Sequence, residues 1–494
     1  MRLIETCFNN FRCFKRYEIN YGSEVTVFFG KNGTGKSSVL SGVRRGLSFM
    51  FAKPRNFQKN LAVSNNAKVR SFEKNEANFD PIDRVYNYPI DNHFKASFTD
   101  GLLQWSMVKQ TQNGGYLTNH YKDVLAVVLG YYNNDLKAEL PVLAVITDSF
   151  PHEMSNFGNK ARKTVGGDVL PRDLAYYGWD ERTNCIELWL NRYYKVANFE
   201  KDVHDEVRAI NDQLELYKQR SELPAGEVQE QNANHTRDHQ TLSRLKERLT
   251  LLQKDERFVA FSRERQFIEQ KLLDFTKPVS EDFHFINRDF ELFRLAVNRP
   301  DKKSYILEFS FKDGRVITFD TLPMGYKRIF SMVIDIAYRS YILNEGLESH
   351  GIVLIDEVEL HLHPTLQQDI LQRLKRTFPN IQFIITTHSP LVISNFRADQ
   401  HNIVIKLNNE GNEYSNRSIG NVYGVDYNTG LTEVMGASYR EAELDKLIDS
   451  IVILKKFNKT DQAEKLQAEL LSIVGEDNAY ILEEIENRLA QNAQ

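Results

Sequence analysis

The sequence is short of cysteine and of long apolar runs, and each shortage excludes a class of protein. Its three cysteines, Cys7, Cys13 and Cys185, are odd in number and lack Cys-x-x-Cys spacing, which argues against a disulfide framework or a zinc site. No apolar run approaches the roughly eighteen residues that a membrane-spanning helix needs. The opening MRLIETCFNNFRCF lacks the apolar core of a signal peptide. We therefore expect a cytoplasmic protein with reduced cysteines and no membrane contact.

The sequence also lacks a strong charge excess of either sign. Its 63 basic and 67 acidic residues give a formal net charge of −4, so no global field favours nucleic acid. The local exception runs from Arg44 to Lys74, where Glu73 is the single acid among many Lys and Arg residues. Such a run either contacts phosphate groups or forms a solvated positive face, and the sequence leaves both readings open.

The segment GKNGTGKSS, residues 30 to 38, predicts a phosphate-binding loop. It matches G-x-x-x-x-G-K-[ST] and stands between a predicted strand and a predicted helix, the context that this motif requires. The glycines allow backbone N–H groups to turn toward phosphates, and the helix N-terminus adds partial positive charge. We expect Lys36 to reach the β- and γ-phosphates and Ser37 to supply a hydroxyl to Mg²⁺. The expected nucleotide-binding residues are Gly30, Lys31, Asn32, Gly33, Thr34, Gly35, Lys36, Ser37 and Ser38.

A second segment, GIVLIDE at 351–357, predicts the catalytic edge of a sheet. Its apolar residues indicate a buried strand, and two carboxylates follow at the carboxyl end, where open α/β sheets bind ligands. We expect Asp356 to hold Mg²⁺ and Glu357 to act as general base toward the attacking water. The alternative is an exposed strand end with two solvated acids, which the phosphate-binding loop in the same chain disfavours.

A histidine follows another apolar strand in IQFIITTHSP. Alone, His388 would be read as an ordinary surface histidine. Together with a phosphate loop and paired acids, it is expected to contact the γ-phosphate or the attacking water. The sequence HLHP offers His361 and His363 as metal ligands, but two histidines without a third ligand fall short of the usual set.

The chain divides into four predicted parts. Residues 1–195 and 277–425 carry strand patterns and would form the two halves of one nucleotide-binding head. Residues 196–276 would form a helical insertion, and residues 426–494 a helical region for assembly or partner binding.

Two apolar runs at helical spacing lie in the insertion. They flank a polar stretch that contains the helix breakers Pro224 and Gly226. The pattern predicts a short antiparallel hairpin with an exposed tip, packed against the head or another subunit. Its apolar positions are Val203, Val207, Ile210, Leu214, Tyr217, Leu242, Leu245, Leu249 and Leu252.

The motifs NFRCF, GKNGTGKS, LIDEVELHLHP and TTHSP together resemble the ABC-type ATPase heads of the RecF, SMC and overcoming-lysogenisation-defect class. The resemblance implies an α/β P-loop fold with a mixed, mostly parallel sheet, an antiparallel β subdomain and a helical-hairpin insertion. It also implies ATP and Mg²⁺ as cofactors, Arg12 beside the nucleotide, and two subunits that sandwich ATP. Residues Glu359 to Pro364 would then belong to the loop at that interface.

The stretch TLPMGYKR, 321–328, occupies the place of the signature sequence L-S-x-G-[QEY] of that class. The resemblance implies that Gly325 acts in trans, with its backbone close to the partner's phosphates. Pro323 departs from the pattern, because proline has neither a hydroxyl nor an N–H to donate. Donors aimed at transition-state charge can change turnover by orders of magnitude. We therefore expect a head that binds ATP and hydrolyses it slowly or hardly at all.

Two further segments, RDLAYYGWDERTNCIELWL at 172–190 and YGVDYNTGLTEVMGASYRE near the C-terminus, resemble PtuA ATPases of Septu and retron anti-phage systems. The resemblance implies an oligomeric subunit that regulates a partner HNH nuclease, PtuB, with DNA or retron nucleic acid as a further partner. The sequence after His388 has no Asp-x-Asp of a TOPRIM nuclease. It also lacks an HNH-type His/Asn set with zinc cysteines, so we expect nuclease activity only from a partner.

Two other functions stay open at the level of the sequence. One is a RecF-like DNA-repair ATPase, in which the basic run 44–74 would contact DNA. The other is a non-hydrolysing module, in which bound nucleotide only joins subunits. The C-terminal resemblance favours the defence ATPase over both.

Overall fold

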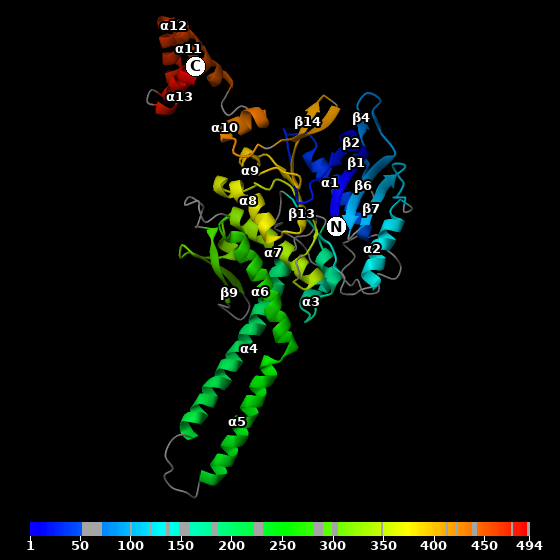
Figure 1. Ribbon diagram of the computed structural model, residues 1–494, viewed down its shortest axis with the longest axis vertical. Helices are drawn as coiled ribbons and strands as arrows, with labels where there is room; N and C mark the ends of the chain where they lie inside the picture. The colour runs from blue at the N-terminus through cyan, green and yellow to red at the C-terminus, as the bar shows by residue number, and fades with distance from the viewer. Residues whose placement is uncertain are drawn as a thin grey trace. The chain divides into compact units, whose positions relative to one another are not determined.

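The larger of two compact units holds the phosphate-binding loop, the paired acids and His388. The units are residues 1–423 and 424–494, and Figure 1 traces the chain. The computed structural model describes residues 1–51, 72–98, 101–117, 120–134, 139–147, 159–179, 186–221, 231–279, 290–298, 305–346, 349–411, 413–420, 422–436, 442–475 and 478–491.

A six-stranded sheet, ordered β15-β14-β3-β13-β12-β8, forms the centre of the larger unit. The strands from β14 to β8 are parallel, and β15 pairs antiparallel with β14 at one edge. The inner strands β3, β13 and β12 are buried along their whole length, which explains their continuous apolar runs. The bounds are β3 Val25–Phe29, β8 Val142–Ile146, β12 Gly351–Ile355, β13 Ile381–Thr387, β14 Asn402–Glu410 and β15 Glu413–Ile419.

An antiparallel sheet of order β2-β1-β6-β7 packs on helix α1, Lys36–Leu47. Gly42 and Gly46 make this contact possible. A Cβ at Gly42 would lie 2.5 Å from the ring of Phe8, and one at Gly46 would lie 2.2 Å from the ring of Phe94. The bounds are β1 Arg2–Phe11, β2 Phe14–Asn20, β6 Ile90–Phe98 and β7 Gly101–Lys109, followed by helix α2, Lys122–Asn134.

A second antiparallel sheet, β11-β10-β9, supports helix α7 through aromatic side chains. Phe309 of β10 stacks on Phe330 of α7 with ring centroids 4.8 Å apart, and Phe290 meets Tyr326 at the same distance. With the mostly parallel central sheet, this arrangement confirms the predicted mixed α/β fold with antiparallel β parts. The bounds are β9 Leu292–Asn298, β10 Ile306–Phe311, β11 Val316–Thr318 and α7 Met324–Asn344.

The helical insertion consists of α4, α5 and α6, and its α4–α5 hairpin extends from the sheets in Figure 1. Helix α4 begins at Ile186, before the start expected at residue 196. The two arms pack through the predicted apolar positions, which confirms the hairpin. Val203, Ile210, Leu214 and Leu252 are buried there, and Val207, Leu242, Leu245 and Leu249 pack against them. The bounds are α4 Ile186–Ser221, α5 Gln231–Gln253 and α6 Glu256–Thr276.

Buried ion pairs fix the root of the hairpin. Arg192 of α4 pairs with Glu264 of α6 at 2.7 Å, and both side chains are 2–3% exposed. Trp189 donates its Nε1–H to Asp335 of α7, which also pairs with Arg339. Because charges buried this deeply must be paired, the root has one well-defined geometry.

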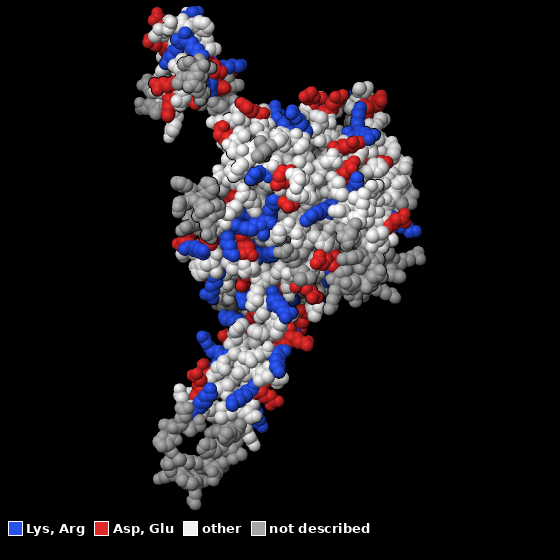
Figure 2. Space-filling view, viewed as in Figure 1, with Lys and Arg blue, Asp and Glu red and all other residues white. Residues whose placement is uncertain are grey.

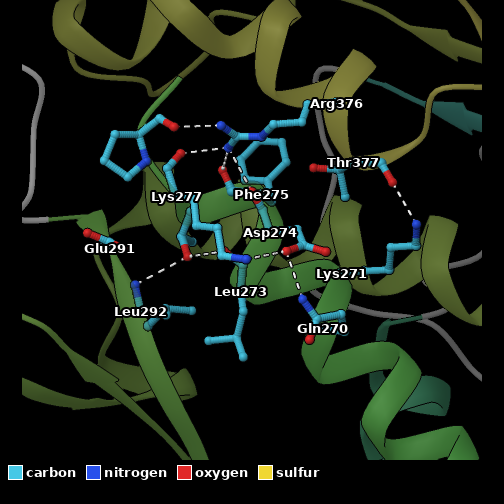
Figure 3. A network of polar contacts seen from close by, with 12 residues as sticks. Gln270, Lys271, Leu273, Asp274, Phe275, Lys277, Glu291, Leu292, Arg376 and Thr377 are labelled. Atoms are coloured by element: carbon cyan, nitrogen blue, oxygen red, sulfur yellow. Dashed lines mark hydrogen bonds and ion pairs between the residues drawn. The ribbon is translucent and has the colours of Figure 1, made fainter. Parts of the chain in front are cut away.

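Helix α8, Pro364–Thr377, holds the C-terminal end of α6 (Figure 3). Its residues Arg373 and Arg376 donate to backbone carbonyls that have no acceptor role inside α6. Their positive charges also suit the negative end of the helix dipole. The acceptors are the carbonyl oxygens of Asp274, Phe275, Thr276, Lys277 and Pro278.

The smaller unit is helical, as the sequence predicts. Helices α11 Ala442–Lys456, α12 Thr460–Val474 and α13 Ala479–Gln491 pack around Ile448, Ile451, Leu470 and Ile485, after the short helix α10 Tyr427–Thr429.

Among the described residues, no helix combines the length and apolarity that crossing a bilayer requires. On the face shown in Figure 2, basic and acidic side chains are interspersed.

Candidate nucleotide-binding site

Three strand ends bring the predicted chemical groups to one edge of the central sheet. Strands β3, β13 and β12 are adjacent and parallel, so their carboxyl ends lie side by side. The phosphate loop follows β3, His388 follows β13, and Asp356 with Glu357 follows β12. This edge is where open α/β sheets bind ligands, and it joins groups that are far apart in the sequence.

Two glycines of the phosphate loop are required by close packing. Gly30 has φ 154°, and a Cβ there would lie 2.4 Å from the carbonyl oxygen of Leu407. Gly35, the N-cap of α1 with φ 95°, would place a Cβ 2.7 Å from the ring of Phe14. The crest of the loop is open to ligand, because Lys31, Asn32, Gly33 and Ser37 are exposed.

Lys36 is turned into the loop. Its Nζ donates to the carbonyl oxygens of Gly30 at 2.8 Å and Lys31 at 2.9 Å, and Thr34 Oγ1 donates to the latter as well. Burial lowers the pKa of Lys36, and the carboxylates Asp356, Glu357 and Glu359 oppose that shift. The ammonium group is thus poised among carboxylates and carbonyls, where phosphate oxygens would be alternative acceptors.

Thr386 of β13 hydrogen-bonds both of the acidic residues that follow β12. Its Oγ1 accepts the backbone N–H of Glu357 at 2.9 Å and donates to Asp356 Oδ1. Glu357 has φ 49°, a left-handed conformation that is uncommon outside glycine and tends to persist at functional sites. Both acids are half-buried, so part of each residue is open to solvent.

Arg328 was not predicted as a site residue. This side chain is 3% exposed and lies on α7, in the second turn after Pro323. It donates to the carbonyl oxygens of Thr147, Asp356 and Glu357 at 2.9–3.1 Å. Helix α7 is therefore tied within one chain to the backbone that carries both acids. Arg328 is part of TLPMGYKR, but its partners could not be read from that motif.

The signature-like stretch begins α7, with Pro323 as the N-cap. Pro323 and Met324 are exposed, as residues at a subunit interface would be. Gly325 is buried, and a Cβ there would lie 2.4 Å from the carbonyl oxygen of His361. The lack of a side chain at Gly325 therefore has a reason inside this chain, separate from the expected action in trans.

Arg12 lies at the β1–β2 turn, in contact with Glu76. Its Nη2 is 3.4 Å from Glu76 Oε1, and the same carboxylate pairs with Arg45 at 2.9 Å. Arg44 and Arg45 are buried, so this end of the basic run contributes to the core. The central part of that run, residues 52–71, lies outside the described residues. Nearby, Cys13 lies against the phosphate loop, with its Sγ 3.2 Å from where a Cβ on Gly35 would stand.

The two histidines of HLHP have separate local roles. His363 is the N-cap of α8, where its ring accepts the backbone N–H of Thr365. His361 is exposed and has φ 64°. The described residues contain no group of three or more His, Cys, Asp or Glu arranged to hold a metal ion.

Comparisons with known proteins find similarity over parts of this chain. The family "AAA domain, putative AbiEii toxin, Type IV TA system" matches residues 176–394, which include both acids and His388. The Vibrio cholerae "Retron Vc95 probable ATPase" is 26% identical over 78% of this chain and 69% of its own length. The Escherichia coli "Retron Ec83 probable ATPase" is 38% identical over 34% of this chain and 32% of its own. Septu protein PtuA of Bacillus mycoides is 29% identical over 38% and 26%, respectively.

Among solved structures, SMC head domains are similar to this chain over most of its length. The head from Pyrococcus furiosus, bound to the C-terminal domain of ScpA, has a TM-score of 0.43 and 12% identity over 85% of this chain and 96% of its own. The head from Thermotoga maritima has a TM-score of 0.39 and 11% identity over 85% and 99%. By sequence, the chain is a homologue of proteins named Septu PtuA and retron probable ATPase, and its residues 176–394 match an AAA-domain family.

Proposed function

We propose that the chain binds ATP with Mg²⁺ at this sheet edge and hydrolyses it slowly. The observation that carries the proposal is the convergence of the phosphate loop, Asp356, Glu357 and His388 at the ends of three adjacent parallel strands. Bound triphosphate would attract Lys36 away from the loop carbonyls, because a phosphate oxygen carries more negative charge than a peptide oxygen.

The oxygen groups at the edge fit a magnesium ion. Ser37 offers an exposed hydroxyl, and Asp356 offers a carboxylate that Thr386 orients. When bound, the ion would neutralise charge on the phosphate oxygens. Glu357 would accept the proton of the attacking water, and His388 would contact the γ-phosphate. Pro323 would offer no donor to that phosphate from the partner head, so turnover should be slow.

The test of this proposal is nucleotide affinity in Lys36→Ala and in a control variant, Lys201→Ala. Lys36 is buried in the phosphate loop, whereas Lys201 is exposed on helix α4 of the hairpin. We expect Lys36→Ala to lose ATP binding by isothermal titration, while Lys201→Ala retains it. Undiminished affinity in Lys36→Ala would refute the phosphate-loop assignment.

We further propose that the ATP-bound form oligomerises and regulates a partner HNH nuclease of the PtuB type. The support is the sequence resemblance to PtuA, together with the exposed Pro323 and Met324 at the start of α7. The experiment is co-purification with the products of adjacent genes, with and without ATP. Recovery without a nuclease would favour the RecF-like DNA-repair function instead.

A second candidate function is a nucleotide-dependent assembly module without hydrolysis. Pro323 favours it, because the residue at that position has neither a hydroxyl nor an N–H. An assay of phosphate release from the purified oligomer separates the two. No release above that of Glu357→Gln would favour the assembly module.

A further inference from the structure

Glu359 forms a bridge between the two strand ends that carry the acids and the histidine. It lies just after Glu357, in the loop that leads from β12 to α8. Its Oε2 accepts the hydroxyl of Thr387 at 2.7 Å, and its Oε1 accepts the backbone N–H of His388 at 2.5 Å. One carboxylate therefore binds two successive residues at the end of β13, and both bonds are charge-assisted.

Further hydrogen bonds extend this bridge beyond His388. The Thr387 hydroxyl also accepts the backbone N–H of Ser389 at 3.0 Å. Ser389 Oγ donates to Gln367 Oε1 at 2.6 Å, and Gln367 Nε2 donates to the carbonyl of Leu362 at 2.9 Å. The segment 357–367 is thus bonded to both sides of His388, which fixes the backbone from which the imidazole projects.

Two neighbouring threonines of β13 hydrogen-bond the acidic residues that follow β12. Thr386 bonds Asp356 and the backbone of Glu357, whereas Thr387 bonds Glu359. Both threonines are fully buried, so these bonds do not compete with bulk water. The spacing between the acids and His388 is therefore set by two adjacent hydroxyls on one rigid strand.

We propose that Glu359 is a positioning residue that holds His388 in register with Glu357. The proposal rests on the ATPase function proposed above. It assigns to Glu359 a role inside its own chain, whereas the family resemblance implies a place in the loop that faces a second subunit. A small displacement of a group that contacts the reacting phosphate can cost a large part of the rate.

The kinetic test uses Glu359→Ala and the near-isosteric Glu359→Gln, with Glu413→Ala on the exposed strand β15 as control. We expect kcat to fall by roughly 10- to 100-fold in Glu359→Ala, with KM changed by less than about threefold. Glu359→Gln should lose nearly as much, because an amide presents an N–H₂ to one of the two donors. Glu413→Ala should match the wild type. A rise in KM with unchanged kcat would overturn the proposal.

A double-mutant cycle separates positioning from general damage. If Glu359 acts through His388, its removal in a His388→Ala background should cost less than about twofold. Full additivity of the two losses would show that Glu359 acts independently of His388 and would overturn the proposal.

Hydrogen exchange provides a readout without turnover. In nucleotide-free protein, the amide of His388 should exchange at least about tenfold faster in Glu359→Ala than in wild type or Glu413→Ala. Unchanged exchange would overturn the proposal even if activity fell. A wild type that does not hydrolyse ATP would refute the proposed ATPase, and the exchange result would then decide the positioning role alone.

Discussion

The nucleotide-binding edge and the root of the hairpin both gather charged side chains, but they hold them differently. At the edge, Asp356, Glu357 and His388 are half-buried and keep part of their surface open. At the root, Arg192 and Glu264 are 2–3% exposed, and protein groups occupy the donors of Arg192. The side chains at the edge thus keep surface that a ligand could reach, whereas those at the root are enclosed by the fold. Substitutions should therefore affect chemistry at the edge and stability at the root.

The largest effect is expected at the edge, from Glu357→Gln. A glutamine cannot accept the proton of the attacking water, so turnover should fall by about 10²- to 10⁴-fold. Binding of ATP should persist, because the phosphate loop is unchanged, and the variant should trap an ATP-bound oligomer. Single-turnover phosphate release measures the loss of chemistry, and thermal unfolding measures whether stability is unchanged. Parental turnover in this variant would show that Glu357 is not the general base.

The predictable part of the site consists of local motifs. The phosphate loop, Asp356, Glu357 and His388 were predicted because each follows a buried strand directly, and parallel strands end at a common edge. Arg328 and Thr386 were missed because their partners lie 28 to 181 residues away in sequence and are joined only by the fold. The two threonines of TTHSP can be read from the sequence. Their hydroxyl partners cannot, because those partners follow β12 and reach the threonines only in the folded chain.

The hairpin shows the same limit. Its apolar spacing predicted two packed arms, because helix periodicity is a local signal. The buried pair Arg192–Glu264 joins residues that are 72 positions apart, and neither residue differs in sequence from a surface charge. The pairing therefore required the structure, and it places the start of the insertion earlier than the change in composition indicated.

The second largest effect is expected at the root, from Arg192→Met. Loss of the guanidinium leaves Glu264 buried without its partner, which typically costs about 3–5 kcal/mol of unfolding free energy. Burial already raises the pKa of Glu264 against the opposing effect of Arg192. The cost should therefore grow as pH rises above the unfolded carboxyl pKa of about 4.3. Urea unfolding at pH 5 and pH 8 measures it.

The matched control for the root is the double variant Arg192→Met/Glu264→Leu. An apolar pair removes the uncompensated carboxylate, so most of the lost stability and its pH dependence should return. Nucleotide affinity should stay near the wild-type value in both variants. Loss of ATP binding in a folded Arg192→Met protein would break the distinction between edge and root.

A smaller effect is expected from Pro323→Ser, which adds a hydroxyl donor at the exposed start of α7. If partner heads meet at this residue, phosphate release should rise by roughly tenfold, because a donor would reach the developing charge. Stability should hardly change, since serine is a good N-cap. Steady-state phosphate release at a protein concentration that supports oligomers measures the gain. Pro323→Ala is the control, because it adds an N–H without a hydroxyl. Equal rates in both variants would leave the missing hydroxyl without a kinetic role.

The smallest effect concerns Glu76, a buried carboxylate that pairs with Arg45 and with Arg12, the residue that the resemblance places beside the nucleotide. Burial alone would raise its pKa, but Arg45, the Glu73 backbone and Arg12 together hold the pKa below its usual value. A carboxylate of this kind stabilises the fold above the unfolded pKa of about 4.3 and loses that contribution as pH falls through the folded pKa. Glu76→Gln should therefore be less stable at pH 7, and its unfolding free energy should change less than that of the wild type between pH 6 and pH 3. If Glu76 belongs with the root charges, ATP affinity should stay constant. Weaker ATP binding would instead mean that Glu76 positions Arg12 to contact the nucleotide, so that this carboxylate contributes to the nucleotide-binding site.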